Sequence, residues 1–336
     1  MRQALSIAFL LPWLSVHAAW AATSTEPIGR IERYDAALDQ IIAADAKIEK
    51  LAEGFTWAEG PVWIPTGEYL LFTDVPENTI YRWSAGQGSR VFLRPSGYAG
   101  PDTGVLREAG ANGLFLERSG TVLLADSGNR LVARLDLDKK TKTPLAVNYQ
   151  GRRFNSPNDV VERSDGSIYF TDPPYGLKDL NNSRVKELSF NGVFRLDPRG
   201  KITIVDDELS FPNGIALSPD ERTLYVANSD PKRAIWMAYS LDADGAVVSK
   251  RLFADASDLV RSGKAGSADG LKVAAAGHLF ASAPGGVLVL TAEGKRLGQI
   301  QTGEKIANCA IGDSGRFLYL TSHKILARVP LRTAAR

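Results

Sequence analysis

Six polar residues recur in the sequence in the same local setting, and their side chains carry oxygen atoms suited to binding a hard cation. Each follows a small residue or a proline and precedes an apolar segment; the six are Glu59, Asn112, Asn158, Asn213, Asp269 and Asn308. Calcium prefers carboxylate and carboxamide oxygens, and magnesium, manganese and zinc are alternatives. If the fold brings these side chains together, they form an oxygen-rich site for one divalent cation.

Rare residue types narrow the chemistry further. The single cysteine, Cys309, excludes an intrachain disulfide and a cysteine-based zinc site, and we expect it to be a small core residue. Only three histidines are present, and His17 lies in an apolar N-terminal segment, so a three-histidine zinc centre is excluded as well. No G-x-S-x-G, P-loop or G-x-G-x-x-G motif is found, which argues against α/β-type serine hydrolases, P-loop nucleotide hydrolases and dinucleotide enzymes.

The overall composition is that of a globular protein with no strong electrostatic preference. Hydrophobic residues make up 44% of the chain and charged residues 23%, which is enough to form a full core. The formal net charge is only +2, so no global field favours nucleic acid. We therefore expect no nucleic-acid partner.

The six polar residues belong to a repeat that predicts the fold. The segments ANGLFLERSGTVLLAD from Ala111 and PNDVVERSDGSIYFTD from Pro157 show its form: a polar residue, an apolar strand, a turn and a second strand ending near a polar residue. The six copies lie about 40 to 55 residues apart, close to the length of one four-stranded propeller blade. The sequence predicts an all-β protein with a six-bladed β-propeller of four-stranded blades over residues 47–332.

A propeller would gather the six polar residues around its central channel, because the innermost strands run along that channel. The alternative is that pairs such as Asn-Gly only form turns. The hairpins have their own turn residues, for example Ser119-Gly120 and Asp165-Gly166. This favours the arrangement of the six polar residues as a ring around the channel. Carboxylates gathered in a channel repel one another and lose hydration, so a bound cation is the simplest way to satisfy them. A purely structural ion in the channel is the competing interpretation.

The chain resembles the SMP-30/gluconolactonase family, and especially its bacterial gluconolactonase branch. The resemblance rests on stretches that include FTWAEGPVW from Phe55, SPNDVVERSDGSIYFTDPPYGL from Ser156, PNGIALSPDERTLYVA from Pro212 and ADGLKV from Ala268. Similar bacterial sequences often read EHGNR where this chain reads ADSGNR, so Ser127 replaces a histidine. This difference bears on the substrate range that the resemblance implies.

The resemblance implies a hydrolase that opens a small sugar lactone, with one divalent metal, commonly calcium. It assigns the metal ligands to Glu59, Asn158, Asn213 and Asp269, and it makes Asp269 the base or the nucleophile. A propeller phosphotriesterase or fluorophosphatase would use the same ligands, and a calcium-stabilised binding propeller is a non-enzymatic alternative.

Three further residues are candidates for contacting the substrate. Asn112 and Asn308 are the asparagines of the ring that the metal does not use, so they are candidates to hydrogen-bond sugar hydroxyls, although turn formation would also explain them. Tyr175, in the DPPYG stretch, is a candidate cap of the channel or a packed loop residue.

The N-terminal segment has the pattern of a signal peptide over residues 1–22. Arg2 precedes an apolar run from Ala4 to Val16, and Ala19-Trp20-Ala21 provides the small residues that signal peptidase reads. A membrane anchor is the alternative, but the run is too short to span a bilayer and contains Pro12. We expect the mature protein to be exported, periplasmic or secreted, and without a membrane segment after cleavage.

Residues 23–46 are predicted to be an N-terminal extension with a short helix. Leu38, Ile41 and Ile42 form one helical stripe within 35–45, which favours a helix packed against the propeller.

Overall fold

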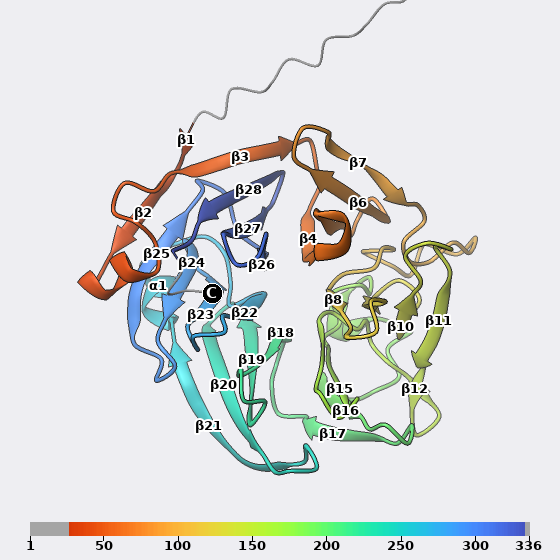
Figure 1. The fold of residues 1–336 in the computed structure, drawn as a ribbon. Helices are drawn as coiled ribbons and strands as arrows, with labels where there is room; N and C mark the ends of the chain where they lie inside the picture. Colours follow the sequence, from red (N-terminus) through yellow and green to blue (C-terminus); the bar gives the residue numbers. More distant parts are fainter. Residues whose placement is uncertain (1–26, 333–336) are drawn as a thin grey trace, which may run out of the picture.

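Residues 27–332 are described by a computed structural model, in which six antiparallel sheets stand around a central channel (Figure 1). The prediction of an all-β protein with a six-bladed β-propeller is therefore confirmed. The predicted signal peptide lies outside the described residues.

The first three blades are each built from one continuous stretch of chain. Within each of these blades, the strands follow one another in chain order from the channel to the rim. Blade 1 consists of β4 (Ala58–Ile64), β5 (Tyr69–Asp74), β6 (Thr79–Ser84) and β7 (Gly88–Leu93). Blade 2 consists of β8 (Leu114–Leu116), β9 (Val122–Asp126), β10 (Leu131–Leu135) and β11 (Lys142–Ala146). Blade 3 consists of β14 (Val160–Glu162), β15 (Ile168–Asp172), β16 (Gly192–Leu196) and β17 (Ile202–Asp206).

Blade 4 follows the same plan, whereas blades 5 and 6 also recruit N-terminal strands. Blade 4 consists of β18 (Pro212–Leu217), β19 (Thr223–Asp230), β20 (Arg233–Leu241) and β21 (Val247–Asp255). Blade 5 consists of β22 (Leu271–Val273), β23 (Leu279–Ala283), β24 (Gly286–Leu290), β25 (Arg296–Gln301) and, at the rim, β2 (Arg30–Arg33). Blade 6 consists of β26 (Asn308–Gly312), β27 (Phe317–Ser322), β28 (Ile325–Pro330), β3 (Ile48–Glu53) and β1 (Pro27–Ile28).

Blade 6 closes the ring by pairing the two ends of the propeller. Only three of its strands come from the C-terminal part, and β3 pairs antiparallel with β28 as the fourth (Figure 1). This pairing gives the last blade its full sheet and covers the edge that β28 would otherwise expose. The four-stranded plan thus holds for four blades, and the N-terminal strands β1 and β2 add a fifth strand to the other two.

The short helix predicted over 35–45 is not supported, because only one turn of 3-10 helix forms there. This turn, η1 (Ala36–Gln40), is capped by the Asp35 carboxylate, which accepts a hydrogen bond from the backbone N–H of Ala37 at 2.8 Å. The flanking strands β2 and β3 belong to different blades, so the segment between them must turn from one sheet to the next. Its apolar side chains are nevertheless buried in the core between blades 5 and 6; they are Leu38, Ile41 and Ile42.

A few short elements complete the structure. The remaining elements are η2 (Pro65–Gly67), η3 (Leu180–Asn182), the α-helix α1 (Ser257–Arg261) and a small hairpin of β12 (Asn148–Tyr149) and β13 (Arg152–Arg153). Among the described residues, none of the helices has the length and apolar character needed to cross a membrane.

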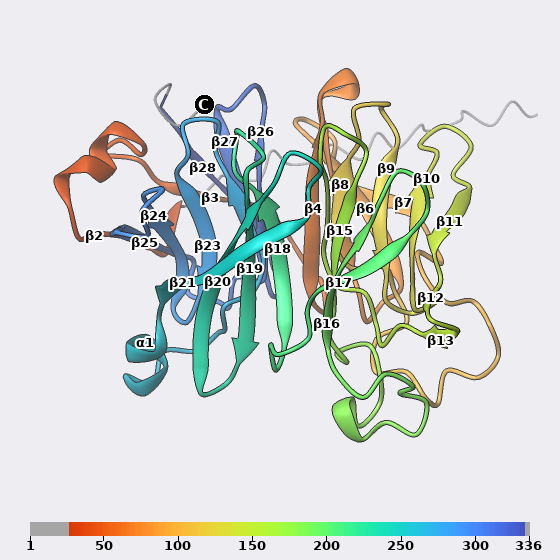
Figure 2. The ribbon, with the colours of Figure 1, turned by 90° about the horizontal axis from the view of Figure 1, so that it is seen from below.

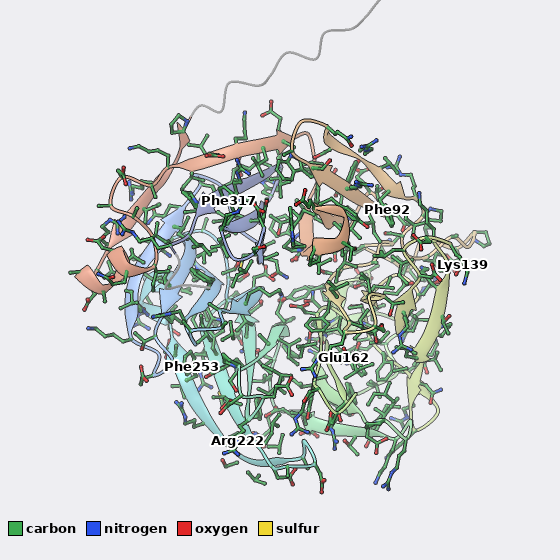
Figure 3. The ribbon with its side chains drawn as sticks, viewed as in Figure 1. Phe92, Lys139, Glu162, Arg222, Phe253 and Phe317 are labelled. Carbon is green, nitrogen blue, oxygen red and sulfur yellow. The ribbon has the colours of Figure 1, made fainter. Side chains whose placement is uncertain are left out.

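Side chains of neighbouring blades fill the space between the sheets (Figure 3). Strands in the middle of a blade are covered on both faces, so they read as continuous apolar runs rather than as alternating patterns. β5 and β24, for example, are buried at every position. Cys309 is fully buried in the core between blades 5 and 6, as expected.

Three long connections gather at one end of the channel. They are residues 94–113, between β7 and β8; 173–191, which contain η3; and 256–270, which contain α1. Figure 2 shows η3 and α1 at the same end, the lower one in that view. An isolated bridge between Leu106 and Leu177 joins the first two connections, so they form one rim around the channel mouth.

Candidate active site

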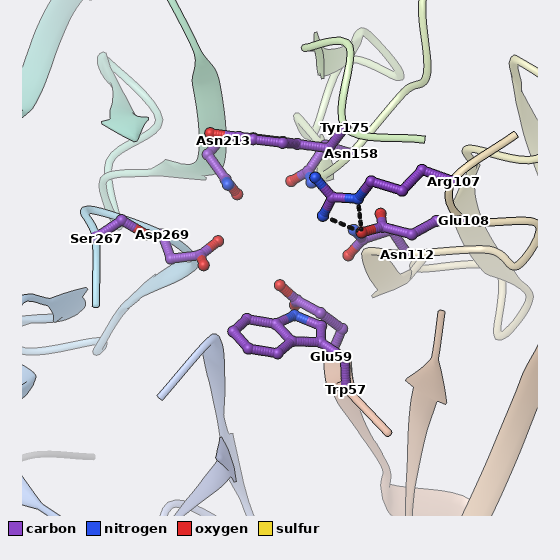
Figure 4. A pocket seen from close by; sticks show the side chains of 10 residues that line it. All are labelled: Trp57, Glu59, Arg107, Glu108, Asn112, Asn158, Tyr175, Asn213, Ser267 and Asp269. Atoms are coloured by element: carbon purple, nitrogen blue, oxygen red, sulfur yellow. Dashed lines mark hydrogen bonds and ion pairs between the residues drawn. The ribbon is translucent and has the colours of Figure 1, made fainter. Parts of the chain in front are cut away.

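The channel contains a small polar cavity that most of the predicted site residues line. Its volume is about 140 Å³, which has room for several water-sized groups. Six of its lining residues were predicted from the sequence: Glu59, Asn112, Asn158, Asn213, Asp269 and Tyr175. Four others were not: Trp57, Arg107, Glu108 and Ser267. In Figure 4, Glu59, Asp269 and Asn213 point from different blades toward a common centre.

Four of the six polar residues, Glu59, Asn112, Asn213 and Asp269, are followed by a glycine, and the packing of the innermost strands explains these Glu-Gly, Asn-Gly and Asp-Gly pairs. A side chain at Gly60 would lie 2.0 Å from the carbonyl oxygen of Asn112 in the next blade, and one at Gly214 would lie 2.4 Å from the carbonyl oxygen of Asp269. These glycines therefore let the starts of neighbouring innermost strands approach closely. The pairs are not hairpin turns, and the ring interpretation of these residues holds.

Polar residues at the end of the second strand in a blade fix the loops that carry the site. The Asp74 carboxylate accepts hydrogen bonds from the backbone N–H groups of Thr56 at 2.8 Å and Trp57 at 3.0 Å. The Thr171 hydroxyl donates to the carbonyl oxygen of Asn213 at 2.7 Å. The Asn213 backbone and the loop before Glu59 are thus anchored, and both side chains line the cavity.

The two ring carboxylates are buried and act on each other. Glu59 is 2% exposed and Asp269 is 8% exposed. Burial, together with the charges of Asp159 and Glu108, raises the pKa of Glu59 to about 7. Burial and the nearby Glu59 charge also raise the pKa of Asp269 well above its ordinary value. Both shifts show that the cavity disfavours two bare negative charges.

The donor set fits a hard cation. Asp269 Oδ1 and Asn112 Oδ1 are buried and have no hydrogen-bond partner within residues 27–332. Unpaired buried oxygens are costly; a cation bound beside Asp269 would supply the partner that its Oδ1 lacks, and a substrate group would supply one for Asn112. No cluster of three His, Cys, Asp or Glu side chains arranged for a metal occurs among the described residues, so the candidate set depends on carboxamides as well as carboxylates.

The Arg107–Glu108 ion pair and the Tyr175 ring line the cavity mouth. The Arg107 guanidinium donates to Glu108 Oε1, with Nε at 3.1 Å, and lies 5.8 Å from the centre of the Tyr175 ring (Figure 4). Tyr175 stacks on Phe211 with 5.6 Å between the ring centroids. Burial raises the pKa of the Glu108 carboxyl, while Arg107 opposes this shift. Tyr175 therefore lines the cavity, and its role as a cap or substrate contact stays a prediction.

Asn308 and Ser127 do not line this cavity. The Asn308 side chain is buried, and its Oδ1 accepts hydrogen bonds from the backbone N–H of Cys309 at 2.8 Å and from Lys272 Nζ at 3.4 Å. The predicted substrate contact by Asn308 is therefore not supported. The Ser127 hydroxyl donates to the carbonyl oxygen of Pro157 at 2.6 Å, so it braces the loop that presents Asn158.

The lining residues that the sequence did not reveal come from irregular connections. Trp57 precedes Glu59 by two residues in the first repeat, and its ring lies 5.4 Å from that of His323. Arg107, Glu108 and Ser267 belong to connections of differing length, which carry no periodic signal. The only hint was the position of Arg107 and Glu108 just before the polar residue of the second repeat.

Comparisons with known proteins agree with this architecture. The chain is 39% identical to the gluconolactonase of Zymomonas mobilis, over 99% of this chain and 97% of that protein. It is 30% identical, with a TM-score of 0.78, to the solved structure of XC5397 from Xanthomonas campestris, described as a gluconolactonase, covering 91% of this chain and 97% of that one. It is also 25% identical to the diisopropyl-fluorophosphatase of Loligo vulgaris, over 61% of this chain and 66% of that protein. Residues 57–324 match the SMP-30/Gluconolactonase/LRE-like region, and the chain belongs to this family.

Proposed function

We propose that the protein is a metal-dependent hydrolase that opens a sugar lactone of the gluconolactone type to the hydroxy acid. The observation that carries this proposal is the unpaired, buried oxygen of Asp269, which shares a small polar cavity with Glu59. The similarity to a gluconolactonase over nearly the whole chain supports the choice of a lactone as substrate.

Four side chains from four blades would hold the cation. They are Glu59, Asn158, Asn213 and Asp269, with calcium as the first choice and magnesium, manganese or zinc as alternatives. A cation bound there supplies Lewis acidity, which polarises a carbonyl group and offsets developing negative charge. The neutral carboxamides add ligands without adding charge to a channel that already contains several carboxylates.

Asp269 is the residue proposed to act on the reacting atoms. Its carboxylate would accept a proton from the water that attacks the lactone carbonyl carbon, after which the ring C–O bond breaks and the alkoxide takes up a proton. Direct attack by the carboxylate on the same carbon is the other mechanism open to it. Asn112 and Tyr175 lie on the cavity wall, where they would hydrogen-bond the hydroxyl groups of a sugar lactone.

An assay with defined metals tests this function directly. Protein stripped of metal should be reloaded with calcium, magnesium, manganese or zinc and tested on aldonolactones, simple γ- and δ-lactones and an organophosphate. We expect rapid hydrolysis of aldonolactones that depends on an added cation. Absence of lactone hydrolysis with all four metals would contradict the proposal.

Hydrolysis of a fluorophosphate is the second candidate activity, and the similarity to the squid diisopropyl-fluorophosphatase favours testing it. It would use the same ring residues, and the organophosphate in the assay distinguishes it from lactone hydrolysis. A propeller that only binds a partner is the non-enzymatic alternative, and the same assay tests it, because such a protein would hydrolyse none of these substrates.

Export of the protein is a separate proposal that rests on residues 1–22 alone. N-terminal sequencing of protein recovered from the periplasm or the medium should give a start near Ala22 or Thr23. Recovery of the intact chain from the cytosol would contradict export.

A further inference from the structure

A partly exposed lysine forms an ion pair with a buried aspartate next to the candidate metal ligands. Lys272, on β22, places its Nζ 3.0 Å from the carbonyl oxygen of Leu271, 3.4 Å from Asn308 Oδ1 and 3.8 Å from Asp159 Oδ2. The Asp159 side chain is 2% exposed and that of Lys272 is 23% exposed. The ammonium group therefore lies among oxygens contributed by blades 3, 5 and 6.

Asp159 is also tied to the blades around it. One of its carboxylate oxygens accepts a hydrogen bond from the backbone N–H of Val160 at 2.9 Å, and the other accepts from that of Ile215 at 3.4 Å. It follows Asn158 directly in the chain, so its charge lies close to the candidate metal ligands. The charge of Asp159 acts on both Glu59 and Asp269.

Four carboxylates lie in or beside the channel, where Asp159 and Glu108 act on Glu59 and Asp269, and two of the four are paired with a cation. Glu108 is paired with Arg107 at the mouth, and Asp159 is paired with Lys272 next to the candidate metal ligands. The other two, Glu59 and Asp269, have no ion-pair partner within residues 27–332 and face the cavity together. Two uncompensated negative charges match the charge of one divalent cation.

We propose that Lys272 is a built-in cation that neutralises Asp159 and thereby sets how strongly the channel attracts a divalent metal. This inference rests on the metal site of the proposed function and assigns Lys272 a positioning role in it. A lysine that only braced the blades would affect folding, whereas a charge-setting lysine changes the affinity for the metal.

Calcium titration calorimetry on metal-stripped protein at pH 8 tests this role. In Lys272→Met, loss of the positive charge should tighten calcium binding by about tenfold or more, because the channel wall then attracts a divalent ion more strongly. The same variant should lower the melting temperature of the metal-free protein, since Asp159 is left as a buried carboxylate without its cation. Calcium should therefore raise its melting temperature by more than it raises that of the wild type.

Two further variants separate charge from structure. Asp159→Asn/Lys272→Met removes both charges and should return calcium affinity to within about threefold of the wild type. It also keeps the test open if Lys272→Met fails to fold, because it leaves no lone buried charge. Lys264→Met is the matched control: Lys264 is partly exposed and lies 3.7 Å from Glu32 at the rim of the same blade. Its calcium affinity should be unchanged.

The outcomes distinguish this inference from the proposed function. If the wild type and Lys272→Met bind calcium with the same affinity, the role of Lys272 is overturned and the metal site remains. If calcium affinity increases equally in Lys272→Met and in the double variant, the role of Lys272 is also overturned, because the effect would then not come from net charge. If the wild type binds none of the four divalent cations, the metal site and the role of Lys272 both fail.

Discussion

Two sets of buried acidic residues lie near the same ends of the blades but face opposite ways. Asp74 and Asp126, at the ends of the second strands, are each 1% exposed and turn away from the cavity toward the loops. Glu59 and Asp269, at the starts of the innermost strands, are nearly as buried and turn into the channel. The two sets differ little in burial, but Asp269 differs from Asp74 and Asp126 in its hydrogen bonds.

The outward-facing carboxylates are fully bonded. Asp126 accepts hydrogen bonds from the backbone N–H of Asn129 at 3.0 Å and from Lys142 Nζ at 2.6 Å, and both oxygens of Asp74 accept from backbone N–H groups. Asp269 Oδ1, in contrast, has no partner among the described residues. A buried carboxylate whose oxygens lack hydrogen-bond partners is a candidate for chemistry or ligand binding. A buried carboxylate with partners for both oxygens stabilises the fold.

The largest effect should follow from Asp269→Asn. This change keeps an oxygen and the size of the side chain but removes the base, so lactone hydrolysis should fall by about a thousandfold or more, as for loss of a general base. The metal-free protein should melt no lower than the wild type, because a repulsive pair of carboxylates is removed. Initial rates on an aldonolactone and a thermal melt measure the two quantities. Near-native turnover with normal metal binding would show that Asp269 is not the base.

A smaller loss is expected from Glu59→Gln. This change removes one charge from the same cavity but leaves Asp269 intact, so calcium should bind about tenfold or more weakly. Activity should then recover in part as calcium is raised, which it should not do in Asp269→Asn. A calcium titration of the initial rate measures the difference. If turnover is unchanged in both variants, the channel is not the active site.

The repeated polar residues predicted both the blades and half of the residues that line the cavity. The same short pattern marks the start of each innermost strand, and symmetry around a channel turns six similar positions into one ring. This argument succeeded for Glu59, Asn158, Asn213 and Asp269, whose side chains do meet. It did not extend to Asn308, because occupying the equivalent position does not fix which groups a side chain contacts, and this one bonds to Cys309 and Lys272 without lining the cavity.

Other features depend on contacts between distant parts of the chain. The pairing of β3 with β28 closes the propeller, but nothing local in either strand identifies the partner. Arg107 and Glu108 reach the cavity from a long connection held by the backbone bond from Arg107 N–H to the carbonyl oxygen of Gly176 at 2.9 Å. Such loops have no period, so their contribution to the site emerges only from the folded structure.

Asp126→Asn should affect stability and leave catalysis intact. The amide loses the ion pair with Lys142, and the free energy of unfolding should fall by about 2 kcal/mol, as for a buried hydrogen bond to a charged group. Lactone hydrolysis should stay within about twofold of the wild type. Denaturant unfolding measures the first quantity and initial rates the second. Glu53→Gln, in an exposed pair with Lys50, is the control and should cost less than about 0.5 kcal/mol. A large loss of activity in Asp126→Asn would show that the outward-facing acids are not purely structural.

Asp172 sharpens the comparison because it faces outward but is only partly satisfied. One carboxylate oxygen accepts a hydrogen bond from the backbone N–H of Asn155 at 2.8 Å, whereas Asp172 Oδ1 has no partner among the described residues. Burial raises the pKa of Asp172 from 3.8 to about 7. The stability that follows from keeping this group neutral is fully present below about pH 3.8 and is lost as the pH rises to about 7, because the unfolded chain ionises first.

Asp172→Asn should therefore remove this part of the pH dependence. The amide keeps an oxygen for Asn155 and cannot ionise, so the variant should be more stable than the wild type at pH 8, by about 1 to 3 kcal/mol, and nearly equal to it at pH 3.5. Denaturant unfolding of the metal-free proteins at these two pH values measures the difference. A variant that is less stable than the wild type at pH 8 would mean that the ionised carboxylate is favourable in the fold. Asp172 would then belong with Asp74 and Asp126 as a satisfied structural acid.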